Sequence, residues 1–453
     1  MKTSKKKTTS PGSIFSYLAY LLLLFLGAFI LGLFMNTDGS GSGEFNSYRG
    51  PVLPMTSLNG AEGVDVKRNV DFDFSPYQDA TDYSTLAKGA TGITDTYILT
   101  NTTGETRTLE LVYAFQGQFI DYPEEFPTIT VDGVAIQPKL YASIDSEELV
   151  WNAHNFERYS QVLTENDFLA IAFQQTEELD IPVTAYHFTD LAYEGSDVAA
   201  FPMLTVQFSL DENTIVWESG RVASDTLDDG RIQMMFRVDR GEAWVFTAGG
   251  TLIDPEFGGN KDYNITDTSA IDGVTFHLET YETTLSEAIR GLAKDYDFWS
   301  IEGLDTYPNA GGLTPELLMD GTVKKIHAKD YMKVSDQLID IDGMFYDVVT
   351  DSRMMYLVFP VEMTAGQSIT VEATYIQEPS LDISGPKHYR EGYELATKLG
   401  SDLHFTELTS SLSNTDPIEL GDQNFGFDLE KGITAVRLDL HIERYYLEVR
   451  IKK

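Results

Sequence analysis

The stretch that decides the fold class is Thr106-Arg-Thr-Leu-Glu-Leu-Val-Tyr-Ala-Phe115. Polar and apolar residues alternate along it, so that Leu109, Leu111, Tyr113 and Phe115 share one face. This alternation is typical of a β-strand with one buried face. Another strand-like run precedes it at residues 94–100, and the polar turn Asn101-Thr-Thr-Gly-Glu105 connects the two. We therefore predict a β-hairpin here.

A second hairpin is predicted around Asp132-Gly133, because this dipeptide between two apolar runs is a strong turn signal. Further strand-like runs lie at residues 181–188, 204–210, 214–217, 231–238, 243–246, 274–280, 354–359, 368–375, 393–399, 434–442 and 444–451. Short strands at this spacing predict antiparallel, β-sandwich-like domains. The predicted fold class is therefore mainly β with a minority of helix.

Helices interrupt the strand pattern in three places. Residues 147–163 and 165–175 have the apolar spacing of helices. Residues 254–273, in contrast, resemble a loop between two later strands. Thr284 is a good N-cap, with Glu287 placed to complete a capping box before an apolar face. A short helix is predicted to begin at Pro315, since proline is favoured at the first helical position.

A membrane anchor is predicted at residues 14–35, IFSYLAYLLLLFLGAFILGLFM. This run of 22 residues has no charge and spans roughly 30 Å as a helix. Lys2, Lys5, Lys6 and Lys7 precede it, so residues 1–13 are expected in the cytoplasm and residues 36–453 outside a single-pass cell membrane. The alternative is a signal peptide cleaved near residues 39–43, but the apolar run exceeds the usual length and no A-x-A-like site follows.

The predicted organisation has five parts. A cytoplasmic tail (1–13) and the transmembrane anchor (14–35) come first, and a flexible linker (36–63) containing Asp38-Gly-Ser-Gly-Ser-Gly43 follows. A β-rich extracellular domain with helical insertions is expected at residues 64–310. A C-terminal β-rich domain is expected at residues 311–453, after the boundary sequence Asn309-Ala-Gly-Gly312.

Composition excludes several classes of partner. Residues 36–453 carry 28 basic and 71 acidic residues, a net charge of −43, which excludes ordinary nucleic-acid binding and disfavours anionic lipid head groups. The charge suits cationic partners or divalent ions. The chain has no cysteine, so disulfides, thiolate metal sites and cysteine nucleophiles are excluded. A large exported chain without disulfides favours a bacterial cell surface.

Catalytic motifs are sparse. The seven histidines form no metal-ligand pattern, and nucleotide-binding and serine-hydrolase signatures are absent. Ser384-Gly-Pro-Lys387 matches S-x-x-K, but Gly-Pro favours a turn over the helix that this chemistry needs. Carboxylate-based glycoside hydrolysis stays open because acids are abundant, for example in Asp121-Tyr-Pro-Glu-Glu125 and at Glu177-Glu178.

Calcium is the one cofactor that the acidic turns favour. Asp225, Asp228 and Asp229 lie in one turn, and Asp340 and Asp342 lie in another, where hard oxygen ligands cluster. Neither turn completes an EF-hand loop, and Asp and Gly also occur in turns for backbone reasons alone. We therefore interpret both stretches as plain turns and expect no cofactor, with calcium bound by these five aspartates as the alternative.

The function expected from the sequence is that of a membrane-anchored, non-enzymatic binding or scaffolding component of a bacterial cell envelope, with a protein or glycan partner. The first alternative is a carboxylate-based envelope hydrolase that acts on glycans. The second is a signalling subunit, although a 13-residue tail could act only through another membrane protein. A sugar-binding platform would require exposed Trp or Tyr.

Overall fold

The computed structural model describes residues 45, 47–76, 90–119, 126–145, 149, 153–174, 181–195, 201–261, 271–295, 315–329, 338–383 and 389–452. Strands dominate these ranges, so the predicted mainly β fold with a minority of helix is confirmed. No helix within them is long and apolar enough to cross a bilayer. The predicted anchor at residues 14–35 lies outside the described residues.

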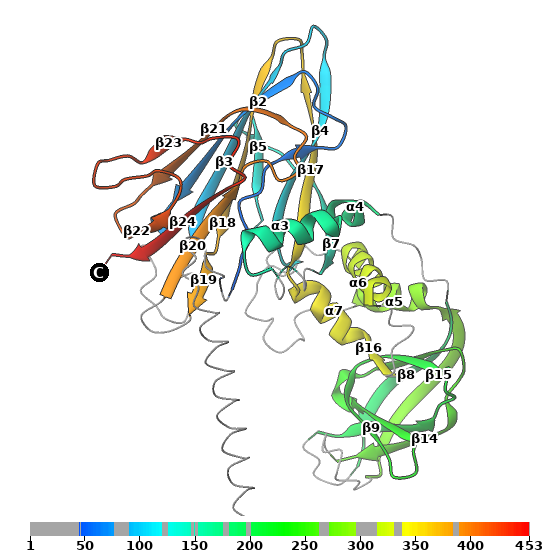
Figure 1. The fold of residues 1–453 in the computed structure, drawn as a ribbon. Coiled ribbons are helices and arrows are strands. Elements are labelled where there is room, and N and C mark those ends of the chain that lie inside the picture. Colours follow the sequence, from blue (N-terminus) through cyan, green and yellow to red (C-terminus); the bar gives the residue numbers. More distant parts are fainter. Residues whose placement is uncertain are drawn as a thin grey trace, which may run out of the picture. The chain divides into compact units, whose positions relative to one another are not determined.

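The described strands form five sheets (Figure 1). The seven-stranded sheet has the order β23 (Ala435–Arg437), β21 (His404–Ser413), β2 (Val64–Asp73), β3 (Thr91–Asn101), β18 (Ser368–Gln377), β5 (Thr128–Val131), β6 (Val134–Ala135). The five-stranded sheet has the order β15 (Val274–Thr284), β8 (Pro182–Tyr193), β13 (Ala243–Ala248), β10 (Ile215–Ser219), β16 (Leu338–Asp340).

Three four-stranded sheets complete the set and are named here by one strand each. The β17 sheet has the order β1 (Thr56–Ser57), β4 (Arg107–Gly117), β17 (Arg353–Met363), β7 (Lys139–Asp145). The β9 sheet has the order β11 (Arg221–Thr226), β12 (Ile232–Arg237), β9 (Met203–Ser209), β14 (Ile253–Asn260). The β20 sheet has the order β19 (Ser380–Ile383), β20 (Tyr389–Ala396), β24 (Arg444–Ile451), β22 (Ile418–Gln423). The described pairings are antiparallel except β2 with β21 and β10 with β16.

The predicted hairpin of residues 94–115 is wrong, although both of its strands exist. β3 pairs with β2 and β18 in the seven-stranded sheet, whereas β4 pairs with β1 and β17. The chain therefore crosses between sheets at residues 102–106. It crosses again at residues 364–367, between β17 and β18. The hairpin at Asp132-Gly133 is confirmed: β5 pairs with β6, and both turn residues have positive φ, as a tight primed turn requires.

The two crossings are held together by Asn101, which is fully buried. Its side-chain Nδ2 donates to the carbonyl oxygens of Glu105, Met363 and Thr364 at 2.7, 3.1 and 3.0 Å. Its backbone amide donates to the Gln367 carbonyl at 2.9 Å. One amide side chain thus satisfies buried carbonyl groups of both crossings.

The Asn101→Ala variant should therefore lower the free energy of unfolding by about 3 kcal/mol, because about 1 kcal/mol is typical for each lost hydrogen bond. Urea denaturation with an unchanged slope would measure this loss. Asn59→Ala is the matched control, since Asn59 bridges to β4 at an exposed position and should cost less than half as much. Equal losses in the two variants would contradict this role of Asn101.

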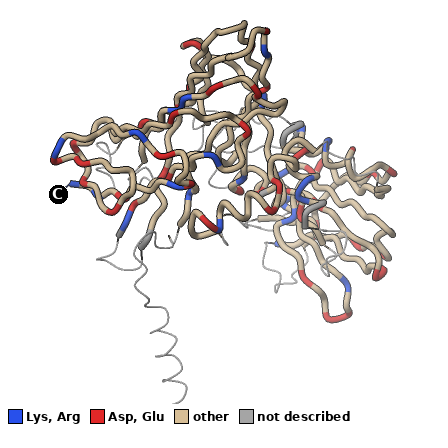
Figure 2. Tube along the Cα trace, turned by 45° about the horizontal axis from the view of Figure 1, so that its top comes forward, with Lys and Arg blue, Asp and Glu red and all other residues tan. Residues whose placement is uncertain are grey.

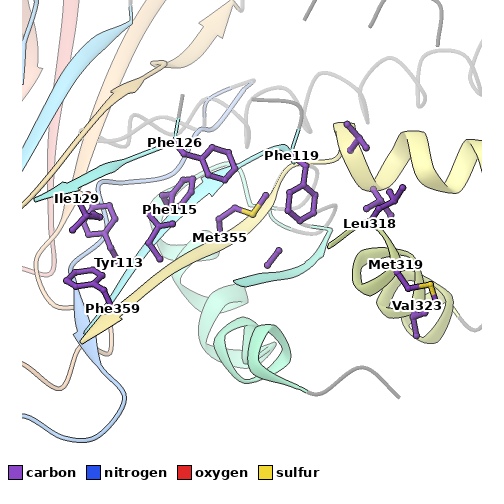
Figure 3. Close-up of a cluster of buried hydrophobic side chains, with 14 of the residues drawn as sticks. Tyr113, Phe115, Phe119, Phe126, Ile129, Leu318, Met319, Val323, Met355 and Phe359 are labelled. Atoms are coloured by element: carbon purple, nitrogen blue, oxygen red, sulfur yellow. The ribbon is translucent and has the colours of Figure 1, made fainter. Parts of the chain in front are cut away.

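The main core lies between the inner face of the seven-stranded sheet and the β17 sheet, and it continues under helices. Figure 3 shows Tyr113 and Phe115 of β4, Met355 and Phe359 of β17, and residues of helix α6 (Pro315–Lys329) within this cluster. The opposite face of β17 is also buried, because Met354, Tyr356 and Val358 pack against helices α3 (Phe156–Glu165) and α4 (Phe168–Phe173) and against the N-terminal segment around Phe45, Tyr48 and Leu53. Burial on both faces explains the continuous apolar run in the sequence of β17.

A second core lies between the other half of the same inner face and the β20 sheet. Arg68 of β2 occupies the seam, between Val66 in the first core and Val70 in the second. Its guanidinium donates to both carboxylate oxygens of Asp95, at 2.9 and 2.7 Å. It also donates to the carbonyl oxygens of Leu53 (3.0 Å) and Ala396 (2.8 Å). Burial lowers the pKa of Arg68, but Asp95 outweighs this effect and the pKa is raised, so the charge persists.

Replacing only Arg68 should be costly because a buried carboxylate would lose its partner. We expect Arg68→Met to lower the free energy of unfolding by about 3–5 kcal/mol. The double variant Arg68→Met/Asp95→Leu should recover part of that loss, since it removes the unpaired charge. Chemical denaturation of both variants tests this, and a double variant less stable than Arg68→Met would contradict it.

The described helices lie between strands: α3 (Phe156–Glu165), α4 (Phe168–Phe173), η3 (Val238–Arg240), α5 (Leu285–Asp295), α6 (Pro315–Lys329) and α7 (Ile341–Thr350). The helix predicted over residues 147–163 is described in part: α3 is capped by Asn155, which accepts from the Arg158 amide, and Leu149 before it is also helical, whereas residues 146–148 and 150–152 lie outside the described residues. Thr284 accepts from the Glu287 amide at 3.2 Å, as predicted, whereas the Glu287 carboxylate accepts from Thr283 rather than completing the box. Pro315 begins α6 as predicted.

Three boundaries differ from the sequence-based expectations. The packed chain begins at Phe45, within the predicted linker 36–63, because the Pro-containing segment 51–54 is extended and bonded to β20. Residues 253–260 form β14 rather than a loop, since the glycines there sit in an edge strand. Strands from before and after the predicted domain boundary at residues 310 and 311 pair within the same sheets: β4 pairs with β17, and β3 pairs with β18.

Candidate functional site

The five-stranded sheet offers an uncovered surface. One of its faces packs against the β9 sheet through residues such as Phe188, Phe236 and Val245. The other face is covered at one end, where Trp217 and Phe246 belong to the same core as α5, α6 and α7. At the other end of that face, partly exposed polar and aromatic side chains replace the apolar ones.

These side chains form a row across the sheet. In register, Glu279 of β15 lies opposite His187 of β8, His187 opposite Trp244 of β13, and Trp244 opposite Ser219 of β10. Opposed residues of neighbouring strands point to the same side. The His187 and Trp244 rings stack in parallel, with centroids 3.4 Å apart. We call Glu242, His187, Trp244, Glu279 and Tyr281 the acid–aromatic face.

Carboxylates dominate the charge of the acid–aromatic face. Glu242 Oε2 lies 3.2 Å from His187 Nε2, yet the Glu242 side chain is 53% exposed, and that of Glu279 is 59% exposed. Tyr281 lies two residues beyond Glu279 on the same side of β15, and partial burial and then this carboxylate raise its pKa. Glu279 also lies 3.6 Å from His277 Nε2, but neither carboxylate is paired with Lys or Arg. An exposed aromatic surface bordered by such carboxylates is suited to a cationic ligand.

The acid–aromatic face borders a free sheet edge. β15 is eleven residues long and pairs with β8, and no described strand pairs with its other side. Residues 279–282 are all exposed, so this stretch is covered on neither face. Natural edge strands are usually protected by Lys, Pro, bulges or short length. β15 contains no Lys, Arg or Pro, and its one bulge lies near its start, between Thr275 and His277.

An acidic junction lies at the opposite border of the same sheet, where β10, β16 and α7 meet. Glu218 of β10 is in register with Asp340 of β16, which caps α7 by accepting from the Gly343 amide at 3.0 Å. Asp342 accepts from Ser219 Oγ and the Gly220 amide, both at 2.7 Å. The Glu218 side chain has no exposed surface, and Arg221 Nε lies 2.7 Å from its Oε1.

The acidic junction contains two carboxyl groups with raised pKa values. Burial raises the pKa of Glu218 to about 8, with Asp340 and Asp342 adding to the rise and Arg221 opposing it. Burial, together with Asp342, also raises the pKa of Asp340. A protonated glutamic acid is a candidate general acid. Both Glu218 oxygens are buried, however, so in this conformation the carboxyl group cannot reach a substrate.

The raised pKa of Glu218 should make the free energy of unfolding depend on pH. The pKa of Glu218 is raised on folding, so its stabilising effect is complete below about pH 4.5 and is lost as pH rises toward 8. We expect Glu218→Gln to reduce the fall in unfolding free energy between pH 5 and 8 by about 3 kcal/mol. Denaturation at several pH values measures this slope. Exposed Glu212→Gln should leave the slope unchanged, and a Glu218→Gln variant with the parental slope would refute the assignment.

The five predicted calcium ligands fall into two separate places. Asp225, Asp228 and Asp229 lie around the turn between β11 and β12, where Asp229 pairs with Arg231 at 2.8 Å. Asp340 and Asp342 lie in the acidic junction and are bonded to backbone and hydroxyl donors. Within the described ranges, no three Asp, Glu, His or Cys residues are arranged to hold a metal ion.

Several other sequence candidates lie outside the described residues: Asp121 to Glu125, Glu177, Glu178, and Ser384 with Lys387. Elsewhere, buried carboxylates serve the packing of the fold. Glu394 of β20, for example, accepts hydrogen bonds from Tyr48 and Arg444 and so ties the N-terminal segment to β24. A hollow of about 430 Å³ lies beside β21 and β23, lined by Thr406, Glu407, Leu408, Arg437, Leu438, Asp439, Leu440 and His441.

Sequence reasoning missed the acid–aromatic face. The strand containing Trp244 was predicted, and the polar or charged residues of β15 alternate with Phe276 and Leu278. This alternation was the available signal for an exposed face. The register that places His187 against both Trp244 and Glu279 involves separations of 57 and 92 residues, and nothing local encodes it.

Comparison with protein-family models and with curated protein sequences finds no match to this chain.

Proposed function

We propose that this chain is a membrane-tethered, non-enzymatic binding or scaffolding component of a bacterial cell envelope. The observation that supports a binding role most directly is the free edge of β15, which borders the acid–aromatic face. A free backbone edge beside exposed side chains offers both affinity and selectivity to a partner. The predicted anchor would hold this surface outside the membrane.

The charge of the chain fits such a role. Acidic and basic positions are interspersed along the described trace (Figure 2), and acids exceed bases by 43 in residues 36–453. A strongly negative surface resists self-association and attracts cationic partners. The same surface disfavours anionic polymers and lipids as partners, so it narrows the class of ligand.

A second candidate function is carboxylate-based hydrolysis of an envelope glycan. Glu218 and Asp340 support it, because they are adjacent carboxyl groups with raised pKa values. A hydrolase needs one such group to reach the scissile bond. Glu218 is closed off beneath Arg221, so this function would require the junction to open. The binding role requires no such change.

The two functions differ in what they release. Full-length protein in lipid nanodiscs should be retained by isolated bacterial envelope material in a saturable manner, without releasing soluble sugars or peptides. Glu279→Lys should weaken that retention. Release of fragments that is abolished by both Glu218→Gln and Asp340→Asn would overturn the proposal in favour of the hydrolase. Absence of retention by any envelope fraction would also overturn it.

A further inference from the structure

The free edge of β15 has the geometry of a strand-addition site. Eleven residues at about 3.4 Å each give an edge roughly 37 Å long. An added strand would lie about 4.8 Å from β15 and would bond to backbone groups that no described strand uses. This mode of binding accepts an extended polypeptide and draws its affinity from main-chain hydrogen bonds.

Side chains of β15 indicate which polypeptide would fit. His277, Glu279 and Tyr281 alternate toward the acid–aromatic face, whereas Phe276 and Leu278 point toward the core with the β9 sheet. Every second residue of an added strand would therefore stand beside Glu279 and Tyr281. Cross-strand neighbours lie about 4.5–5.5 Å apart, so a Lys or Arg there would contact the carboxylate and the ring together.

Charge argues against a second copy of this chain as the occupant. β15 contributes Glu279 and Glu282 and no Lys or Arg, so two copies would bring four carboxylates together with no Lys or Arg between them. Like charges on opposed strands are destabilising. The net charge of −43 in residues 36–453 adds long-range repulsion between copies.

We propose that β15 binds an extended, cationic polypeptide segment as an additional strand, with alternate Lys or Arg side chains over the acid–aromatic face. This inference rests on the proposed binding function and names its partner class. The partner contributes main-chain hydrogen bonds to the edge and positive charge to Glu279 and Glu242.

The test uses full-length protein in zwitterionic nanodiscs and a fluorescein-labelled ten-residue peptide of alternating Thr and Lys. Fluorescence anisotropy should show saturable binding that empty nanodiscs lack. A Thr-Glu peptide, and a Thr-Lys peptide with two central prolines, should bind at least tenfold more weakly, because proline removes ladder donors. Hydrogen exchange of amides in residues 275–283 should slow when the Thr-Lys peptide binds.

Matched variants distinguish peptide binding at the edge of β15 from a general effect of the negative surface charge. Glu279→Lys should weaken Thr-Lys binding at least tenfold, and Tyr281→Ala should weaken it severalfold. Glu419→Lys changes an equally charged, exposed residue on the edge strand β22, and it should change affinity by no more than twofold. Melting curves verify that each variant folds. Equal losses in Glu279→Lys and Glu419→Lys, or equal binding of the proline peptide, would overturn the proposal.

The outcomes distinguish this inference from the function on which it rests. Envelope retention that persists while no peptide binds would overturn the cationic strand and leave the binding role intact. Loss of both would overturn both. A concentration-dependent dimer in which residues 275–283 are protected would replace the cationic partner with a second copy.

Discussion

The arrangement of the sheets depends on the ion pair between Arg68 and Asp95. The inner face of the seven-stranded sheet is covered by two separate sheets, and the seam between them would leave carbonyl groups buried without donors. Arg68 supplies those donors to Leu53 and Ala396 while Asp95 balances its charge. Tyr97 extends the network, since its hydroxyl donates to Asp95 and accepts from the Met55 amide. An apolar residue at position 68 could fill the same space, but it could not donate hydrogen bonds to Leu53, Asp95 and Ala396.

Much of the secondary structure could be predicted from the sequence, whereas the pairing of strands could not. Alternation along residues 106–115 correctly predicts a strand with a buried face, because that pattern is local. It does not reveal that β4 pairs with β17, more than 200 residues away, since a sheet crossing and a hairpin turn use the same polar residues. The Asp132-Gly133 hairpin was predictable because its turn requires positive φ at both positions. At the candidate site, Asp340 and Asp342 were predicted as candidate calcium ligands, whereas Asp340 caps α7 and Asp342 accepts hydrogen bonds from Ser219 and Gly220 at the end of β10, which no local pattern encodes.

The five-stranded sheet combines two kinds of acidic chemistry on opposite borders. At β10, the Glu218 carboxyl group is withdrawn from water, and this burial raises its pKa. At β15, the Glu279 carboxyl group is exposed to solvent. Burial alone separates these roles, because the residue types are the same. The chain therefore uses its many acids selectively: a few hold elements together, and others define the character of the surface.

The burial of Asn101 has a consequence for how the protein can be produced. Asn101-Thr-Thr103 is an acceptor sequence for N-linked glycans, yet its amide nitrogen is fully enclosed and donates to three carbonyl groups. A sugar on that nitrogen would leave it a single hydrogen and would have no space in the folded chain. Glycosylation and folding therefore exclude each other at this position. A host that glycosylates secreted chains during synthesis would therefore produce some molecules in which Asn101 cannot form the hydrogen bonds that join the two sheet crossings.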